Sequence, residues 1–411
     1  MDYKIFAPKR AIGEIDLPAS KSISNRALIL NALCCHPAPL HNVAHCDDTD
    51  AMVAALSSLD DVINIGAAGT AMRFLTAYFA TREGRTVVLD GSERMRQRPI
   101  GILVDALRSC GANIEYTLNE GFPPLRITGA QLKADCIEMA GNVSSQYISA
   151  MLMIAPLISG CRRLRLTGNV ISLPYINMTL QLMSRFGVDA DFDGSEILFS
   201  ENACYSAPDF TIENDWSAAS YWFQIQALMP QSRISLKGLF PVSSQGDSAT
   251  ARLFEPLGVA CNWCGAYLDL RRGAAPNDML KLNLIENPDL AQTIVVTACL
   301  LGVKFHISGL QTLKIKETDR IEALRSQLLK LGFVIEVDPD YSLRWDGKRI
   351  APQEAPSIAT FKDHRMAMAF APAASLFPGL VIEDAGVVSK SYPQYWEHLQ
   401  QVGYKIQRIN E

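Results

Sequence analysis

Residues 107–116 run Leu-Arg-Ser-Cys-Gly-Ala-Asn-Ile-Glu-Tyr, which is the end of an amphipathic helix, a glycine and then an alternating strand. The same pattern returns four times, and successive copies are 76, 71, 74 and 71 residues apart. Their glycines are Gly187, Gly258, Gly332 and Gly403. Glycine ends helices well because it accepts the left-handed conformation, and alternation is typical of a half-buried strand. With a sixth, imperfect copy at residues 55–59 and a strand after position 61, the pattern predicts an α/β (α+β) fold of six repeated subdomains, divided three and three.

The bulk composition limits the classes of function. The chain has 411 residues, 48% of them hydrophobic, and a formal net charge of −5. This length indicates two or three domains, and the acidic balance argues against a nucleic-acid partner. Met1–Leu17 lacks the apolar run of a signal peptide, and Pro372 and Pro378 interrupt the most apolar long stretch, Met366–Ile382. We therefore expect a cytoplasmic protein with no membrane segment.

Ten cysteines are present, and Cys261 and Cys264 form a lone CxxC within a stretch that resembles a strand. A CxxC can be a redox pair or half of a zinc site, but no second CxxC or His pair accompanies this one. Buried thiols in a reducing cytoplasm are the favoured interpretation.

The chemistry is concentrated in short polar segments that open helices, namely Ser20–Arg26, Gly66–Arg73, Lys316–Arg320 and Asp363–Arg365. Each offers Ser, Thr or Asp as a cap, yet each places Lys or Arg where the helix dipole disfavours a cation. Two further cationic segments, Arg94–Arg98 before Pro99 and Ser389–Lys390, precede predicted helices. The cations are Lys21, Arg26, Arg73, Arg98, Lys316, Arg320, Arg365 and Lys390. Any one segment alone is better explained as a solvated face or surface ion pair, but together they predict binding sites for two phosphate-bearing ligands.

The motifs that mark several other kinds of functional site are missing from the sequence. The sequence has no Walker A, GxGxxG or HExxH motif. The acidic run Asp47-Asp48-Thr49-Asp50 lacks EF-hand spacing and is better interpreted as a helix N-terminus. A P-loop, dinucleotide or metalloenzyme function is therefore not expected.

Several segments, taken in order, resemble those of one known family, the EPSP synthases, over nearly the whole chain. They are Pro18–Ala27, Ala68–Arg73, Arg98–Gly101, Ser144–Gln146, Gln245–Asp247, Lys316–Arg320, Asp363–Arg365 and Lys390. The resemblance implies two similar domains, each a threefold pseudo-repeat of a βαβαββ-type unit in an inside-out barrel, joined by a two-stranded hinge. It places the first domain, with phosphoenolpyruvate and catalytic residues, at 1–19 plus 214–411, and the domain that binds shikimate 3-phosphate at 20–213.

The resemblance also implies an activity and its residues. The carboxyvinyl group of phosphoenolpyruvate would pass to the 5-hydroxyl of shikimate 3-phosphate by addition and elimination through a tetrahedral intermediate, a step of aromatic amino acid biosynthesis. Shikimate 3-phosphate would contact Lys21, Ser22, Arg26, Ser144, Ser145, Gln146, Ser172, Asp289 and Lys316. Phosphoenolpyruvate would contact Gly69, Arg98, Gln146, Arg320, Arg365 and Lys390, and Lys21 would reach both ligands. The catalytic residues would be Asp289, which takes the hydroxyl proton, Glu317, which handles the C3 methyl proton, Lys21 and His364.

No metal or organic cofactor, no nucleic acid and no membrane partner is implied, and a monomer is expected. Ala67, Phe74 and Thr312 stand where many or some relatives carry Asn, Pro and Asn, which bears on affinity and on the response to glyphosate. One alternative is the related transferase that acts on UDP-N-acetylglucosamine, but Ser22 follows Lys21 and residues 94–99 contain no cysteine. A non-catalytic phosphate-binding paralogue is the other alternative, and the retained acid–base residues argue against it.

Overall fold

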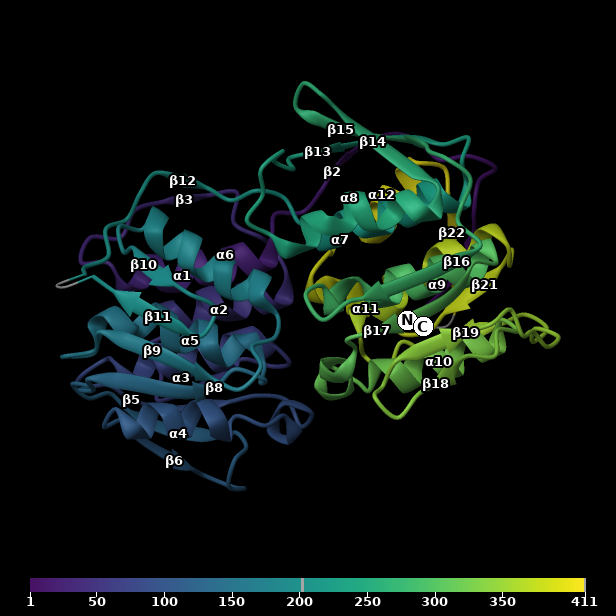
Figure 1. The fold of residues 1–411 in the computed structure, drawn as a ribbon. Coiled ribbons are helices and arrows are strands. Elements are labelled where there is room, and N and C mark those ends of the chain that lie inside the picture. The colour runs from purple at the N-terminus through teal and green to yellow at the C-terminus, as the bar shows by residue number, and fades with distance from the viewer. Residues whose placement is uncertain (201–202, 410–411) are drawn as a thin grey trace. The chain divides into compact units, whose positions relative to one another are not determined.

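The computed structural model describes residues 1–200 and 203–409, and its internal contacts divide the chain into two compact units. Unit 1 comprises Met1–Ala19 and Glu213–Glu411, and unit 2 comprises Ser20–Ile212. The chain therefore passes between the units twice, and the elements of each unit are drawn in Figure 1.

Small sheets recur through the described part of both units, and the four-stranded ones share a common plan. In unit 1 they are, in spatial order, β2 (Ile12–Asp16), β13 (Arg233–Lys237), β15 (Tyr267–Arg272) and β14 (Val259–Cys264); β16 (Met279–Asn283), β17 (Lys304–Ser308), β19 (Leu343–Trp345) and β18 (Glu336–Val337); and β20 (Ser357–Ile358), β21 (Leu380–Ile382), β1 (Asp2–Phe6) and β22 (Lys405–Ile409). In unit 2 they are β4 (Val62–Asn64), β5 (Thr86–Asp90), β7 (Leu125–Thr128) and β6 (Asn113–Tyr116); and β8 (Cys136–Ala140), β9 (Arg163–Thr167), β11 (Glu196–Phe199) and β10 (Ala190–Phe192).

Each four-stranded sheet follows a βαβαββ order. From β4 the chain runs through α3 (Gly69–Ala80), β5, α4 (Gly101–Ser109), β6 and β7. A helical crossover makes β4 parallel to β5, and the β6–β7 hairpin then adds two antiparallel strands. The other four-stranded sheets repeat this pairing pattern. The predicted repeat of βαβαββ-type units is confirmed.

Two repeats depart from the common plan. In the last one, β1 from the N-terminus supplies the fourth strand and pairs with both β21 and β22, so the two chain ends meet in one sheet (Figure 1). In unit 2 the sixth repeat is reduced to the parallel pair β3 (Leu40–His41) and β12 (Phe210–Thr211). The strand after Asp61 is therefore not the hairpin of the sixth copy, as the sequence pattern suggested, because β4 pairs with β5 as the first strand of the next repeat.

The first helix of each repeat is buried on nearly all sides. These helices are α1 (Lys21–Leu33), α3 and α5 (Ser145–Ile154) in unit 2, and α7 (Trp216–Leu228), α9 (Ala291–Leu301) and α11 (His364–Phe370) in unit 1. Within each unit the three pack on one another. Since every one of the residues from Ala291 to Leu300 is buried, α9 has no polar face to turn outward. The strands alternate buried and exposed positions, so each unit is an inside-out barrel with helices in the core and sheets outside it.

The second helix of each repeat is amphipathic or short. These helices are α2 (Asp47–Ser57), α4, α6 (Leu173–Arg185), α8 (Thr250–Phe254), α10 (Arg320–Lys330) and α12 (Tyr395–Gln401). Except after α2, the segment closes at one of the five predicted glycines, whose φ angles lie between +87° and +103°. A side chain at such an angle is strained, which explains why glycine marks the repeat.

Two local predictions need correction. The N-cap of α3 is Ala68, which makes no side-chain cap hydrogen bond, so the Gly66–Arg73 segment is not capped by Ser, Thr or Asp. Pro99 does not open the following helix either, because α4 begins at Gly101. The acidic run at Asp47 does begin α2, as expected.

The cysteines are all free thiols, and the prediction that they are buried is wrong for six of them, since Cys161 and Cys261 are half-buried and four others are exposed. Cys35, Cys136, Cys204 and Cys264 are exposed. Cys261 and Cys264 lie three residues apart on β14 and their side chains alternate, which explains why this CxxC forms no pair. In the described residues no helix is long and apolar enough to cross a membrane.

Candidate active site

In unit 2 the N-termini of α3 and α5 lie together at one end of the helical core. Gln146 Nε2, near the start of α5, donates to Thr70 Oγ1, near the start of α3, at 3.1 Å. Ser144 caps α5 and its hydroxyl accepts from Gln146 N at 3.4 Å, with Ser145 next to it in the first turn. The free backbone N–H groups at such helix starts make an anion site where they converge.

Arg26 connects α1 to the other helices of unit 2. Its Nε donates to Thr179 Oγ1 on α6 at 2.8 Å, Nη2 to Ser149 Oγ on α5 at 3.0 Å, and Nη1 to Ser22 O at 3.0 Å. Ser172, the predicted ligand of the shikimate phosphate, is the N-cap of α6. In the described residues the hydrogen bonds that Arg26 donates go to neutral oxygens, and its guanidinium also lies over the rings of Phe74 and Tyr175. Burial lowers the pKa of the guanidinium to about 10. A buried cation without a carboxylate partner favours an anionic ligand.

Lys21 stands in the first turn of α1 and pairs with Asp48 in the first turn of α2, with Nζ and Oδ2 3.0 Å apart. The side chain of Lys21 is 14% exposed, which leaves it partly accessible to a ligand. Asp48 belongs to the acidic run, to which the sequence assigned only a dipole role, and it here orients a predicted ligand-binding lysine.

Arg98 lies directly over the start of α3. A Cβ added to Gly69 would be only 2.4 Å from Arg98 Nη1, so the absent side chain leaves the space that the guanidinium fills. Arg98 is 7% exposed, and its Nε has no hydrogen-bond partner in the described parts of the chain. The loop around it is fixed by Tyr147, whose hydroxyl donates to Pro99 O at 2.5 Å, and by Arg73.

Arg73 differs from the other cations singled out in the sequence. Its guanidinium donates to Gly69 O at 3.1 Å and to Pro99 O at 2.8 Å, and it contacts Met95 Sδ at 3.3 Å. These contacts join the start of α3 to the Arg98 loop. Arg73 therefore positions Gly69 and Arg98.

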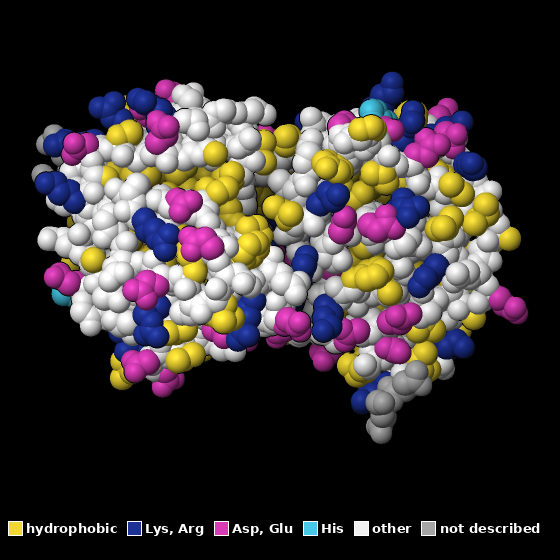
Figure 2. All heavy atoms as spheres, turned by 90° about the horizontal axis from the view of Figure 1, so that it is seen from below, with side chains coloured by type: hydrophobic (Ala, Val, Ile, Leu, Met, Phe, Trp, Pro, Cys, Tyr) yellow, Lys and Arg dark blue, Asp and Glu magenta, His cyan; other side chains and the backbone are white. Residues whose placement is uncertain are grey.

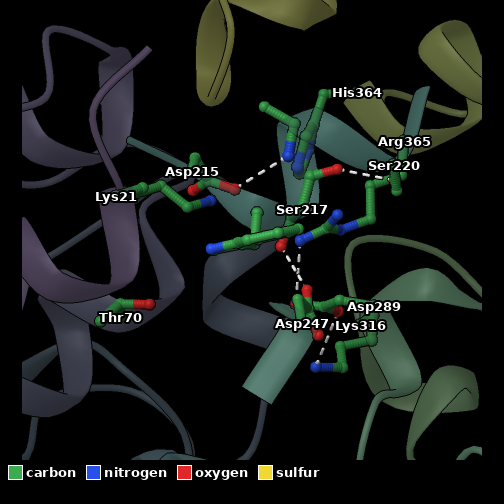
Figure 3. Close-up of polar contacts among 12 residues, drawn as sticks. Lys21, Thr70, Asp215, Ser217, Ser220, Asp247, Asp289, Lys316, His364 and Arg365 are labelled. Atoms are coloured by element: carbon green, nitrogen blue, oxygen red, sulfur yellow. Dashed lines mark hydrogen bonds and ion pairs between the residues drawn. The ribbon is translucent and has the colours of Figure 1, made fainter. Parts of the chain in front are cut away.

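In unit 1 the predicted base, Asp289, lies among three cations. Two of them, Lys316 and Arg365, are labelled beside it in Figure 3. Its Oδ1 is 3.6 Å from Lys316 Nζ and 3.0 Å from Arg320 Nη1, and its Oδ2 is 2.9 Å from Arg365 Nη2. Burial by itself raises the pKa of Asp289, but Arg365, Lys316 and Arg320 outweigh it and hold the pKa well below 3.8. The carboxylate is ionised at neutral pH, as a general base must be.

Arg320 joins the acidic residues of unit 1 into one network. Its Nε is 2.7 Å from Asp363 Oδ2, and its Nη2 is 2.9 Å from Glu317 Oε2. Lys390, at the end of a 3-10 helix, reaches the other oxygen of Glu317 at 3.1 Å. Only 1% of the surface of Arg320 is exposed, and its guanidinium pairs with carboxylates of its own chain. The predicted pair Asp289 and Glu317 is thereby held on the two sides of one guanidinium.

His364 is buried at the start of α11, and its Nδ1 is 3.7 Å from Asp363 Oδ1, too long for a hydrogen bond. Asp363 caps the same helix by accepting from Arg365 N at 2.9 Å, and this cap orients Arg365 toward Asp289. The structure therefore places His364 next to the network, and its proton-handling role stays a prediction.

Asp247 is a site residue to which the sequence assigned no role. It follows β13 in the Gln245–Asp247 motif, is 4% exposed, and accepts a short hydrogen bond from Ser217 Oγ in the first turn of α7 (Figure 3). Burial, followed by the charge of Asp289, raises its pKa to about 6. Asn287 Nδ2 also donates to Gly246 O at 2.8 Å, which connects the Asp247 and Asp289 segments.

The two units thus differ in the partners of their buried cations. In unit 2, Arg26 and Arg98 are buried and form no salt bridge with a carboxylate of the described residues, an environment suited to binding an anion. In unit 1, buried cations surround carboxylates, an environment suited to moving protons. On the face drawn in Figure 2, Lys and Arg are interspersed with Asp and Glu, so this face does not show the same segregation of charge. Residues 1–200 and 203–409 contain no group of three or more His, Cys, Asp or Glu side chains placed to hold a metal ion.

Comparison with known proteins gives consistent matches along the chain. The family model for EPSP synthase (3-phosphoshikimate 1-carboxyvinyltransferase) matches residues 5–63 and 57–399. A 3-phosphoshikimate 1-carboxyvinyltransferase from Bacteroides fragilis is 52% identical over 406 residues, covering 99% of each chain. One from Vibrio atlanticus is 37% identical over 420 residues, covering 95% of this chain and 97% of that one.

Solved structures share the fold at low identity. An EPSP synthase from Acinetobacter baumannii has a TM-score of 0.75 at 19% identity and covers 99% of this chain and 100% of its own. The enolpyruvyl transferase NikO from Streptomyces tendae has a TM-score of 0.74 at 15% identity and covers 99% of this chain and 98% of its own.

Proposed function

Since this chain belongs to the EPSP synthase family, we propose that it transfers the carboxyvinyl group of phosphoenolpyruvate to the 5-hydroxyl of shikimate 3-phosphate and releases phosphate. The observation that carries this proposal is the Asp289 network, where an ionised carboxylate and a second acid, Glu317, share Arg320. An addition to the enol double bond of phosphoenolpyruvate needs one group to take the hydroxyl proton and another to exchange a proton with C3, and we assign these roles to Asp289 and Glu317.

We assign shikimate 3-phosphate chiefly to unit 2. Lys21, Ser22 and Arg26 on α1, the Ser144–Gln146 helix start and Ser172 would hold its phosphate and hydroxyls. The support is that Arg26, within residues 1–200 and 203–409, donates to hydroxyl and carbonyl oxygens and forms no salt bridge with a carboxylate. Asp289 and Lys316 of unit 1 complete the assignment, with Lys316 contacting the acceptor hydroxyl.

The residues assigned to phosphoenolpyruvate occur in both units. In unit 2 they are Gly69, Arg98 and Gln146, and the support is the buried Arg98 guanidinium, whose Nε has no partner. In unit 1 they are Arg320, Arg365 and Lys390. Cations of this kind stabilise negative charge on a transferring or departing phosphate.

The reaction follows from the roles of these groups. Asp289 takes the proton of the 5-hydroxyl as its oxygen attacks C2 of phosphoenolpyruvate, and an acid delivers a proton to C3, giving a tetrahedral intermediate. Glu317 then removes a proton from the C3 methyl group as the C–O bond to phosphate breaks, which restores the double bond. In this scheme the ligand's own anions compete for Arg365, Lys316 and Arg320, and this raises the basicity of Asp289 when it is needed.

A phosphate-release assay tests the proposal. Phosphoenolpyruvate is supplied with either shikimate 3-phosphate or UDP-N-acetylglucosamine, without added metal. Phosphate release with shikimate 3-phosphate alone is the expected result. Release with the nucleotide sugar would identify the related transferase, and silence with both, in protein that still binds shikimate 3-phosphate, would identify a non-catalytic paralogue.

We further propose that the protein acts as a monomer in the cytoplasm. Every residue assigned above comes from one chain, and free thiols, some of them exposed, suit a reducing compartment. Light scattering during size-exclusion chromatography, with and without ligands, measures the oligomeric state directly.

A further inference from the structure

Two segments far apart in the sequence run side by side in the reduced repeat of unit 2. β3 and β12 are parallel, with Leu40 opposite Phe210 and His41 opposite Thr211. The alignment continues beyond the strands, since Asn42 Nδ2 donates to Ile212 O at 2.7 Å. Continued toward the N-terminus, the same register brings Cys35 beside residues 204 and 205.

The side chains of this region confirm that the register continues. Cys35 lies close enough to Cys204 to raise the pKa of its thiol, as the register requires, and both residues are exposed. Cys34, their neighbour, is buried, and its Sγ points to the carbonyl of Leu30 at 3.2 Å. Burial also raises the pKa of Cys34 to about 11, which makes its thiol unreactive at neutral pH. Of the three thiols, only the contacting pair is accessible to a solute.

We propose that Cys35 and Cys204 form a reversible disulfide when the protein meets a hydroperoxide. The thiolate of one cysteine attacks the peroxide O–O bond, giving a sulfenic acid and releasing an alcohol, or water when the oxidant is hydrogen peroxide. The second thiol attacks the sulfenic sulfur, the S–S bond forms, and the hydroxyl leaves as water. The two cysteines together lose two protons and two electrons, which the peroxide accepts. A thiol reductant reverses the bond by exchange.

In the reduced repeat, this disulfide would hold a segment that has few other backbone contacts. Other repeats hold their chain segments in four-stranded sheets, whereas the segment from Cys204 to Ile212 is held by a two-residue strand pair. A disulfide would close a long loop between α1 and this segment, and long loops lose the most unfolded-state entropy on closure. The bond lies beyond the C-terminal end of α1, about 20 Å of helix away from Lys21. The inference is therefore independent of the transfer activity.

Peptide mapping tests the proposal on the full chain. The reduced protein is treated with hydrogen peroxide in slight molar excess, blocked with a thiol reagent and digested without reductant. We expect a cross-linked peptide pair containing Cys35 and Cys204, an intact mass lower by two hydrogen atoms, and reversal by dithiothreitol. Oxidation is expected to raise the thermal midpoint by on the order of 5 °C.

Three variants make the outcome decisive. Cys35→Ser and Cys204→Ser, both at exposed positions, are expected to lose the cross-link and the shift in midpoint. Cys264→Ser, at an exposed thiol in unit 1, is the matched control and is expected to keep both. Separate oxidation of Cys35 and Cys204 to sulfinic acids, or a bond from Cys204 to Cys34, would overturn the proposal.

Discussion

Replacing Gly69 by alanine places a methyl group where the Arg98 guanidinium now lies. The new Cβ would be 2.4 Å from Nη1, 2.9 Å from Cζ and 3.0 Å from Nη2. Non-bonded contacts of this kind become comfortable near 3.5 Å, so the guanidinium must retreat by about 1 Å. The group that moves is the far end of a flexible side chain, and alanine favours a helix start over glycine, so the free energy of unfolding is expected to change by less than about 1 kcal/mol.

The cost falls instead on ligand binding. A retreat of about 1 Å removes a charge-assisted hydrogen bond to an anion, which is worth roughly 1.5–3 kcal/mol. This corresponds to a KM for phosphoenolpyruvate raised by about 10- to 100-fold. The KM for shikimate 3-phosphate is expected to stay within about threefold, because its assigned ligands on α1 do not move.

Steady-state phosphate release, with each substrate varied in turn, measures both constants. Gly101→Ala is the matched control, since this glycine also opens a helix of unit 2, but its added Cβ would be 3.5 Å from Gly121 Cα and 3.7 Å from Tyr116 Oη, both ordinary contacts. The control is expected to keep both KM values. An unchanged KM for phosphoenolpyruvate in Gly69→Ala, in protein of normal stability, would refute the placement of Arg98 in the site.

Further expectations concern unit 1. Arg320→Met leaves three carboxylates without their shared cation and is expected to lower the free energy of unfolding in guanidinium by about 3–5 kcal/mol near neutral pH; a loss below about 1 kcal/mol would contradict the network. Asp289→Ala is expected to abolish turnover while calorimetry still detects shikimate 3-phosphate binding; lost binding would make Asp289 a positioning residue. Asp247 has its pKa raised to about 6 from an ordinary 3.8, so its protonated form contributes stability below pH 3.8 that is lost as pH rises through 6. Between those pH values the wild type is thus expected to lose about 3 kcal/mol relative to Asp247→Asn, and thermal midpoints of the two proteins that move in parallel would contradict this.

Much of the fold was predictable because the repeat has a local signature. A glycine that follows an amphipathic helix and precedes a strand can be recognised within ten residues, and Gly111, Gly187 and Gly332 each mark such a position in the structure. The reduced repeat was misjudged for the same reason. The segment from Ala55 to Val62 has the local pattern, but only pairing with β5 shows that its strand begins another sheet.

In the candidate site, too, some residues could be predicted from the local sequence and others could not. Cations at helix starts stand out in the sequence because they violate the preference of the dipole, which is how Lys21, Arg320 and Arg365 were found. The partners of these cations could not be identified from the local sequence, because Arg320 contacts Asp289 and Asp363, which are 31 and 43 residues away. No local pattern encodes a contact made by packing one repeat on another. For that reason Arg73 could not be told from Arg98 by its sequence context, although Arg73 positions a loop, and no role was predicted for Asp247.

The path of the chain has a consequence for synthesis on the ribosome. Unit 2 is one continuous segment, Ser20–Ile212, so all of its partners have emerged once half of the protein has been made. Unit 1 cannot close until β22 has been made, because β22 pairs with β1, which precedes the whole of unit 2 in the chain. β2 finds its partner β13 soon after unit 2 has been made, but β1 stays unpaired until β21 and β22 emerge. Unpaired strand edges favour association with other chains, so β1 is the strand of unit 1 that is exposed to this risk for longest during synthesis.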